Sequence, residues 1–279
     1  MLFRSEPMSG SSHNHLALIV AANNQQAVLC TYGNDHPQFL EYTLAVTSAV
    51  AALNLPFAVP NPILTANGER LYRHDDGYRT WLMSMMPWLP GDHPALDDGQ
   101  AFRQAGHAFS RLLNALAQVT VAPLSPPAYL NLSRVHSYII DPLSALRAAP
   151  VNSDNVQHII DVLETLQPQL ATLYDHLPQQ IIHGDFVPRN VLLLNDTVSA
   201  VLDFELCRND LRILDVAIAL LAWGGFPNNY DGTMLCQFVQ GFHEVIVLSD
   251  DEIAALPTMM RLVYIVRLLQ VLEIGRAHV

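Results

Sequence analysis

Hydrophobic and polar residues follow patterns along the chain that predict strands in the first third and helices after it. Short apolar runs between polar turns favour hairpins, whereas apolar residues three and four apart favour helices. The elements predicted in the first third are strands 16–20 and 27–32, a helix 39–53, a hairpin of 63–64 with 70–72 around Asn67-Gly68, and a strand 80–86. The helices predicted in the remainder are 96–119, 143–149, 156–174, 216–223, 235–247 and 257–272.

The two patterns meet at the segment Pro87-Trp88-Leu89-Pro90-Gly91, where proline and glycine end regular structure abruptly. We therefore predict an N-terminal part over residues 1–87, with a small antiparallel sheet and one helix, and a larger helical part over 88–279. Strands followed by a run of helices are typical of the α+β class.

Composition and net charge limit the classes of molecule that the chain is expected to bind. The chain has 279 residues, 51% of them hydrophobic and 14% charged, which predicts a globular protein. A net charge of −12 disfavours nucleic acid or an anionic membrane surface as a partner and favours a cationic or metal-bound one. All 14 basic residues are arginines, so chemistry that needs a lysine of this chain is excluded. Three widely spaced cysteines do not indicate a disulfide framework.

We expect no membrane span and a cytoplasmic protein. Residues 44–67 carry no formal charge over the length of a spanning helix, but Pro56, Pro60 and Pro62 interrupt them. The N-terminus lacks the apolar segment of a signal peptide. Residues 2–5 and 273–279 resemble translated sequencing-adapter sequence, so we expect the natural protein to extend beyond one or both ends.

A second hairpin is predicted inside the helical part. Two apolar runs, over 191–202, flank the turn Asn195-Asp196-Thr197. With the turn centred there, Asn190 lies opposite about Leu202, and the side chains of Asn190 and Asp203 emerge together, roughly 5–8 Å apart. Asp185 lies in the loop that enters the same end. Two carboxylates and an amide are therefore expected to converge.

This set of oxygen donors has a specific use. Magnesium takes one or two carboxylates and leaves positions for substrate phosphates, and an aspartate outside the metal shell can deprotonate an attacking hydroxyl. The order His183-Gly184-Asp185, four residues, Asn190, and then Asp203-Phe204 is that of a protein-kinase catalytic loop and metal site. Alternatively, Asp185 is a turn residue and Asp203 a strand-end cap. The full set in order favours the kinase interpretation.

The segment 181–219 resembles the aminoglycoside phosphotransferase and choline kinase superfamily, and most of all its homoserine kinase type II-like members. The resemblance implies a bilobal, protein-kinase-like fold and transfer of the ATP γ-phosphate to a hydroxyl of a small molecule such as homoserine, another amino alcohol or an aminoglycoside. It implies that Asp185 is the catalytic base, and that Asn190 and Asp203 hold Mg²⁺ on the nucleotide.

Three further residues acquire roles from the same resemblance. Glu205 would face the substrate, and His183 would anchor the catalytic loop through a hydrogen bond. Asp215 would brace that loop, although an acid at a helix N-terminus is favoured by the helix dipole in any case.

The resemblance also assigns the nucleotide-binding residues of the N-terminal part. Small residues before the first predicted strand, namely Ser9, Gly10, Ser11 and Ser12, match the loop that covers the phosphates. Glu41, early in the first helix, matches the family's paired glutamate. Met86 and Trp88 belong to the hinge that would receive adenine.

The lysine that kinases place on the strand before that helix is missing, and Cys30 stands at its position. Three interpretations remain. In the first, magnesium and loop amides suffice to hold the phosphates, and Glu41 is a surface acid. In the second, an arginine such as Arg70, Arg73 or Arg79 reaches into the site. In the third, the protein is a nucleotide-binding regulatory module with little transfer activity. A metal-dependent phosphohydrolase is a further alternative. The presence of every base and metal residue favours activity.

The acceptor and the oligomeric state are not predicted by any single residue. The acidic chain suits a cationic or zwitterionic acceptor. A protein substrate is disfavoured, because no Asp-Phe-Gly to Ala-Pro-Glu segment follows Asp203.

Overall fold

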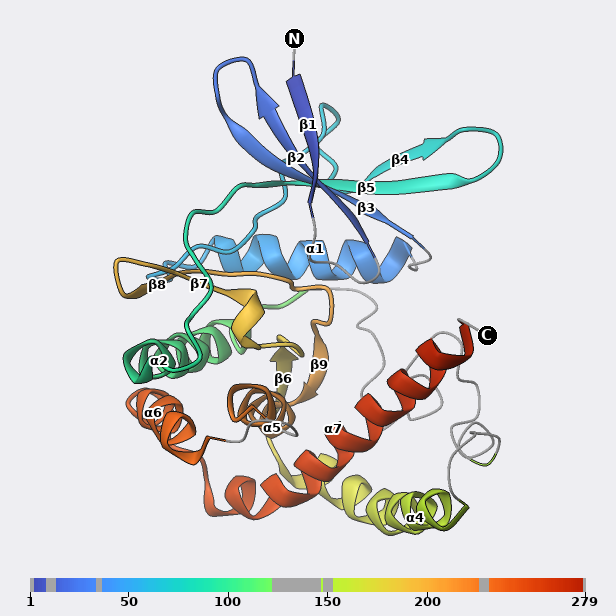
Figure 1. The fold of residues 1–279 in the computed structure, drawn as a ribbon, viewed down its shortest axis with the longest axis vertical. Helices are drawn as coiled ribbons and strands as arrows, with labels where there is room; N and C mark the ends of the chain where they lie inside the picture. Colours follow the sequence, from blue (N-terminus) through green and yellow to red (C-terminus); the bar gives the residue numbers. More distant parts are fainter. Residues whose placement is uncertain are drawn as a thin grey trace.

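The computed structural model describes residues 3–8, 14–33, 37–121, 147, 153–225 and 231–277. It has the predicted α+β fold, with an antiparallel sheet and a helix first and a helical part after them (Figure 1). None of the helices in these ranges is both long enough and apolar enough to cross a bilayer. The division into parts at residues 87 and 88 stays a prediction.

The N-terminal sheet has five antiparallel strands in the order β1-β2-β3-β5-β4. They are β1 (Phe3–Met8), β2 (His15–Ala21), β3 (Gln26–Tyr32), β4 (Tyr72–Asp75) and β5 (Thr80–Pro87). The helix α1 (Pro37–Ala51) lies beside the sheet, on the side of the helical part (Figure 1). Buried side chains of Tyr32, Leu40 and Leu82 join the helix to the sheet in one apolar cluster.

Strand β1 was not predicted. Its residues Arg4 to Pro7 are exposed, so no apolar face marks it in the sequence. The predicted phosphate-covering residues Ser9 to Ser12 therefore lie between two strands and not before the first one, and they lie outside the described residues.

The predicted hairpin of 63–64 with 70–72 is wrong. The turn at Asn67-Gly68 forms, but Ile63 donates its backbone N–H to the carbonyl of Met85, and β4 pairs with β5. The connection between β4 and β5 is the turn around Asp76-Gly77, where Asp75 and Asp76 accept backbone N–H groups. Both segments thus use β5 as their partner. The Asp76-Gly77 turn is a local signal for the pairing of β4 with β5, whereas no local signal pairs Ile63 with Met85.

Among the residues that the structure describes, five helices make up most of the C-terminal part, and they agree with the predicted ones to within a few residues at most ends. They are α2 (Gly99–Leu116), α4 (Ser153–His176), α5 (Arg212–Trp223), α6 (Gly232–His243) and α7 (Asp250–Ala277). The last begins seven residues before the predicted 257, so Pro257 lies inside it. The predicted helix 143–149 lies outside the described residues apart from Arg147.

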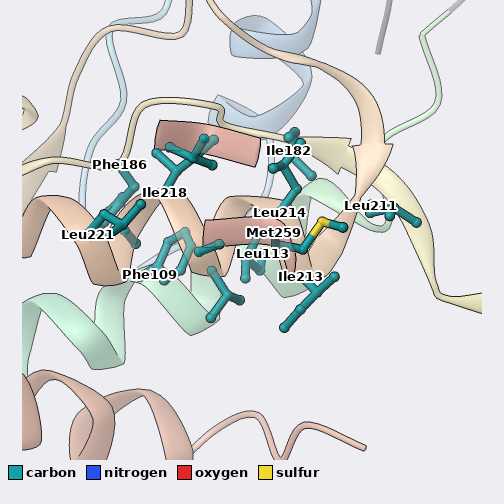
Figure 2. Packing of buried hydrophobic residues seen from close by; sticks show 14 of the residues in the cluster. Phe109, Leu113, Ile182, Phe186, Leu211, Ile213, Leu214, Ile218, Leu221 and Met259 are labelled. Carbon is teal, nitrogen blue, oxygen red and sulfur yellow. The ribbon is translucent and has the colours of Figure 1, made fainter. Parts of the chain in front are cut away.

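The main core lies among these helices and includes the loop that carries Asp185. Phe186 stacks on Phe109 of α2 with 4.5 Å between ring centroids, and Ile218 and Leu221 of α5 pack in the same cluster (Figure 2). Burying a phenylalanine contributes about 1.5–3 kcal/mol. The residue after Asp185 therefore anchors that loop in the core.

Two small antiparallel pairs lie between the sheet and the helices. They are β6 (Gln179–Ile182) with β9 (Arg208–Leu211), and β7 (Val191–Leu194) with β8 (Thr197–Val201). The second pair is the predicted hairpin. Residues that precede α2 hold it in place, because Ala58 donates to the carbonyl of Ser199 and Asp92 exchanges backbone hydrogen bonds with Leu193.

Candidate active site

The loop between β6 and β7 is fixed by buried contacts at its start. Asp215 of α5 is buried, and its two carboxylate oxygens accept the backbone N–H groups of His183 at 2.8 Å and Gly184 at 2.9 Å. Burial raises the pKa of Asp215 to about 6, although these two hydrogen bonds act in the opposite direction. These contacts are the ones that a bracing role requires.

Gly184 is required by this packing. Its φ of +81° lies in the left-handed region, and a Cβ there would lie 2.6 Å from the carbonyl oxygen of Leu206. The neighbouring Arg208 is buried, and its guanidinium pairs with Asp210 at 2.8 Å and donates to the Leu206 carbonyl at 3.0 Å. A side chain at position 184 would displace this buried arrangement.

His183 is completely buried and held by both ring nitrogens. Nδ1 accepts the backbone N–H of Asp185 at 3.2 Å, so Nε2 carries the proton and donates it to the Leu202 carbonyl at 3.1 Å. Burial lowers the pKa of His183 to about 4. The neutral ring thus ties the loop to the end of β8, as the predicted anchor role requires.

Asp185 and Asn190 contact each other directly. The Asn190 side-chain amide nitrogen donates to the Asp185 carbonyl at 2.9 Å and to its Oδ2 at 3.0 Å. Asn190 is buried in the short helix η2 (Pro188–Asn190). Since its amide nitrogen faces Asp185, its amide oxygen is the atom left for another partner.

Asp203 follows the second strand of the hairpin and lies at its open end beside Asn190, where the sequence predicts it. The Leu202 N–H donates to the Asn190 carbonyl at 2.8 Å, which sets Asp203 next to the Asn190 position. Its φ of +63° is strained for a residue with a side chain. Burial raises the pKa of Asp203, and the negative charge of the nearby Asp185 carboxylate raises it further. The two carboxylates therefore repel each other, as expected for neighbours.

Glu205 joins this segment to the N-terminal sheet. Its carboxylate accepts a hydrogen bond from the Asn14 side chain at 2.7 Å and lies 4.0 Å from the sulfur of Cys30 in β3. Cys30, at the position of the missing lysine, is buried. The acid two residues after Asp203 thus lies beside the place where kinases carry a lysine.

Of the three candidate arginines, only Arg73 contacts the predicted paired glutamate among the described residues. Its guanidinium lies 3.6 Å from Glu41, and both side chains are about half-exposed. The Arg70 side chain donates to Ser48, and Arg79 lies over the ring of Trp81.

The predicted hinge residues lie at the end of β5. Met86 is partly buried against the cluster that joins α1 to the sheet, and it pairs with Val28 of β3. Trp88 is exposed, and its backbone N–H donates to the Gln26 carbonyl.

One charged residue of the site was not predicted. The Arg189 guanidinium donates to Oδ2 of Asp185 at 2.6 Å. The spacing did not predict this pair, because no helix joins the two residues: η2 begins only at Pro188, and Asp185 lies in the loop before it.

The oxygen donors of Asn190 and Asp203 fit a magnesium ion whose remaining ligands come from the substrate. Within the described ranges there is no group of three or more His, Cys, Asp or Glu side chains that could hold a metal. The Asn190 amide oxygen and the Asp203 carboxylate supply two hard donors, and magnesium usually takes few protein ligands and several from phosphate or water. The orientation of the Asn190 amide is the observation that supports this fit.

Comparisons with known proteins give a family match for most of the chain. Residues 6–252 match the phosphotransferase enzyme family. A homoserine kinase of Rhodospirillum rubrum is 30% identical over 230 residues, which are 81% of this chain and 66% of that protein. A homoserine kinase of Nitrobacter winogradskyi is 31% identical over 210 residues, 72% of this chain and 59% of that protein. The chain thus spans less than two thirds of the length of these relatives.

Solved structures share the fold. An amicoumacin kinase in complex with AMP-PNP and Ca²⁺ aligns with a TM-score of 0.75 at 17% identity, covering 96% of this chain and 80% of that one. A microcompartment-associated aminopropanol kinase aligns with a TM-score of 0.74 at 18% identity, covering 97% and 83%. At such identities the likeness concerns the fold alone.

Proposed function

Because the chain belongs to the phosphotransferase enzyme family, we propose that it transfers the γ-phosphate of ATP to a hydroxyl group of a small molecule. The observation that carries this proposal is the convergence of Asp185, Asn190 and Asp203 at the open end of one hairpin. Phosphoryl transfer depends on positioning and charge stabilisation, for which such a fixed set is suited.

In this proposal Asp185 is the base. Both hydrogen bonds that its carboxylate accepts within the described residues go to Oδ2, which leaves Oδ1 to accept the proton of the acceptor hydroxyl. Asn190 and Asp203 would hold Mg²⁺. When bound, that ion would offset the negative charge of the nucleotide phosphates. His183 and Asp215 keep the loop in position through its backbone.

We propose the nucleotide site on the N-terminal sheet, with Ser9 to Ser12 over the phosphates and the end of β5 at the adenine. Glu41 pairs with Arg73, which leaves the phosphates to loop amides, magnesium and other cations. Glu205 faces the same site from the helical part.

An amino alcohol is the proposed acceptor, with homoserine the first candidate. The relatives of about 30% identity are homoserine kinases. The acidic chain suits an acceptor that carries an amine. Aminoglycosides are the second class to test.

The test is acceptor-stimulated ADP formation across a panel of amino alcohols, amino acids and aminoglycosides. Asp185→Asn should abolish transfer, by a factor of about 10² to 10⁴, while ATP still binds. Asp161→Asn, an exposed aspartate of α4, is the matched control and should leave transfer unchanged. Normal turnover by Asp185→Asn would refute the role of this residue as base.

The alternative is a nucleotide-binding module with little transfer activity, favoured by Cys30 at the lysine position. It predicts ATP binding without ADP formation for any acceptor. A phosphohydrolase would instead release phosphate with no acceptor present. The same panel separates all three.

A further inference from the structure

We infer that Arg189 supplies the positive charge that stabilises the phosphoryl group during transfer, from a position next to the catalytic base. This inference rests on the proposed function and adds to it a residue that contacts the phosphoryl group. Its basis is the pairing of Arg189 with Asp185, together with the absence of lysine.

The geometry places the guanidinium at the reacting end of the site. Arg189 donates to Oδ2 of Asp185 at 2.6 Å, and Asn190, the next residue, donates to the same oxygen at 3.0 Å. The helix η2 that holds Arg189 begins with Pro188, whose ring fixes its own φ angle. The backbone is thus restricted one residue before the one that carries the guanidinium.

The side chains of Asp185 and Arg189 differ sharply in solvent exposure. The Asp185 side chain is 15% exposed, whereas that of Arg189 is 67% exposed. A guanidinium has five N–H donors, and the bond to Asp185 uses one of its terminal nitrogens. Donors thus remain for phosphate oxygens, to which the planar guanidinium binds well. An ion pair with so exposed an arginine contributes little to the stability of the fold.

Other arginines of the described ranges form ion pairs elsewhere. Those with a carboxylate partner are Arg4 with Glu6, Arg73 with Glu41, Arg103 with Glu244, Arg208 with Asp210, and Arg212 with Glu252. Arg189 is the one among these ranges that contacts Asp185. Since the chain has no lysine, we assign to Arg189, among the arginines of the described residues, the charge that meets the transferred group.

The transfer step explains why the charge is needed there. The acceptor oxygen forms a bond to the γ-phosphorus, and the bond from that phosphorus to the oxygen bridging to the β-phosphate breaks. The hydroxyl proton passes to Asp185, and ADP leaves with the bridging oxygen. Negative charge is spread over the phosphoryl oxygens in between, and a fixed cation beside them lowers the barrier.

The experiment compares wild type, Arg189→Lys and Arg189→Met by thermal shift, with Mg²⁺-ADP alone and with Mg²⁺-ADP plus aluminium fluoride, which mimics the phosphoryl group in transit. We expect ADP to stabilise all three proteins. Aluminium fluoride should add a further shift in wild type, a smaller one in Arg189→Lys and none in Arg189→Met. Arg103→Met, which breaks an ion pair between α2 and Glu244, the residue after α6, is the matched control and should behave as wild type.

Two outcomes overturn the inference: an aluminium fluoride shift in Arg189→Met equal to that of wild type, or no such shift in wild type. A wild type that ADP does not stabilise contradicts the proposed function instead, so the two failures are distinguishable. Once an acceptor is known, Arg189→Met should lower kcat by roughly 10²-fold with little change in the KM for ATP. A loss confined to the acceptor KM would assign Arg189 to acceptor binding and overturn the inference.

Discussion

At the residue scale, the site depends on ionisable groups kept in particular states by burial. His183 accepts the N–H of Asp185 through Nδ1, which is possible only while the ring is neutral. Its lowered pKa secures that state at neutral pH. The residue types and their order predict that Asp185, Asn190 and Asp203 meet. They do not predict the partner of Arg189, because its rotamer depends on which carboxylate is in reach in three dimensions.

His183 gives a prediction on pH. Its pKa is about 4 in the folded protein and about 6.5 in an unfolded chain, so the unfolded chain binds the proton more tightly. The stabilisation is therefore complete above about pH 6.5 and is lost as the pH falls toward 4. The difference in unfolding free energy between wild type and His183→Asn should be roughly 2 kcal/mol smaller at pH 5 than at pH 7.5.

Urea unfolding at the two pH values measures this difference. His158→Asn, an exposed histidine of α4, is the control and should show no such change. A difference that is the same at both pH values would mean that His183 is not held neutral.

At the scale of elements, the hairpin of β7 and β8 fixes the distance between Asn190 and Asp203. Its turn residues Asn195 and Asp196 have φ angles of 51° and 59°, the conformation of a type I′ turn. This hairpin was predictable because turn and strand signals are local. Strands β1 and β4 were not correctly predicted, because both are exposed edge strands without an apolar face that would mark them in the sequence.

The turn gives a prediction on stability. Asp196→Gly should stabilise the protein by about 0.5–1 kcal/mol, since glycine adopts positive φ without the clash of a Cβ. Asp196→Ala keeps the Cβ and loses the local hydrogen bonding of aspartate, so it should destabilise. Unfolding free energies from urea titration provide the measurement. Destabilisation by both variants to the same extent would contradict the I′ assignment.

At the scale of the whole molecule, the N-terminal sheet and the helical part meet at Glu205. Its contacts with Asn14 and Cys30 join segments almost 200 residues apart. The α+β class and the order of the two parts follow from the hydrophobic pattern. The contact of Glu205 with Cys30 does not follow from the sequence, since neither a cysteine on a strand nor an acid after a hairpin indicates its partner.

The last prediction concerns the lysine position at this junction. Asp185, Asp203 and Glu205 make the phosphate side of the proposed site acidic, which opposes the binding of a polyanion. Cys30→Lys would place an ammonium group near the Glu205 carboxylate, now 4.0 Å from the cysteine sulfur. An added cation at such a site is worth about 1 kcal/mol, so the KM for ATP should fall several-fold, or the ADP thermal shift should increase.

Cys236→Lys, on the exposed surface of α6, adds the same charge elsewhere and should leave ATP binding unchanged. Both variants need a circular dichroism check, because Cys30 is buried and a lysine there must be paired to be tolerated. If Cys30→Lys folds yet binds ATP no better than wild type, the phosphates do not approach β3. The protein would then bind the phosphates through loop amides and magnesium, and the absence of lysine would cost it no affinity.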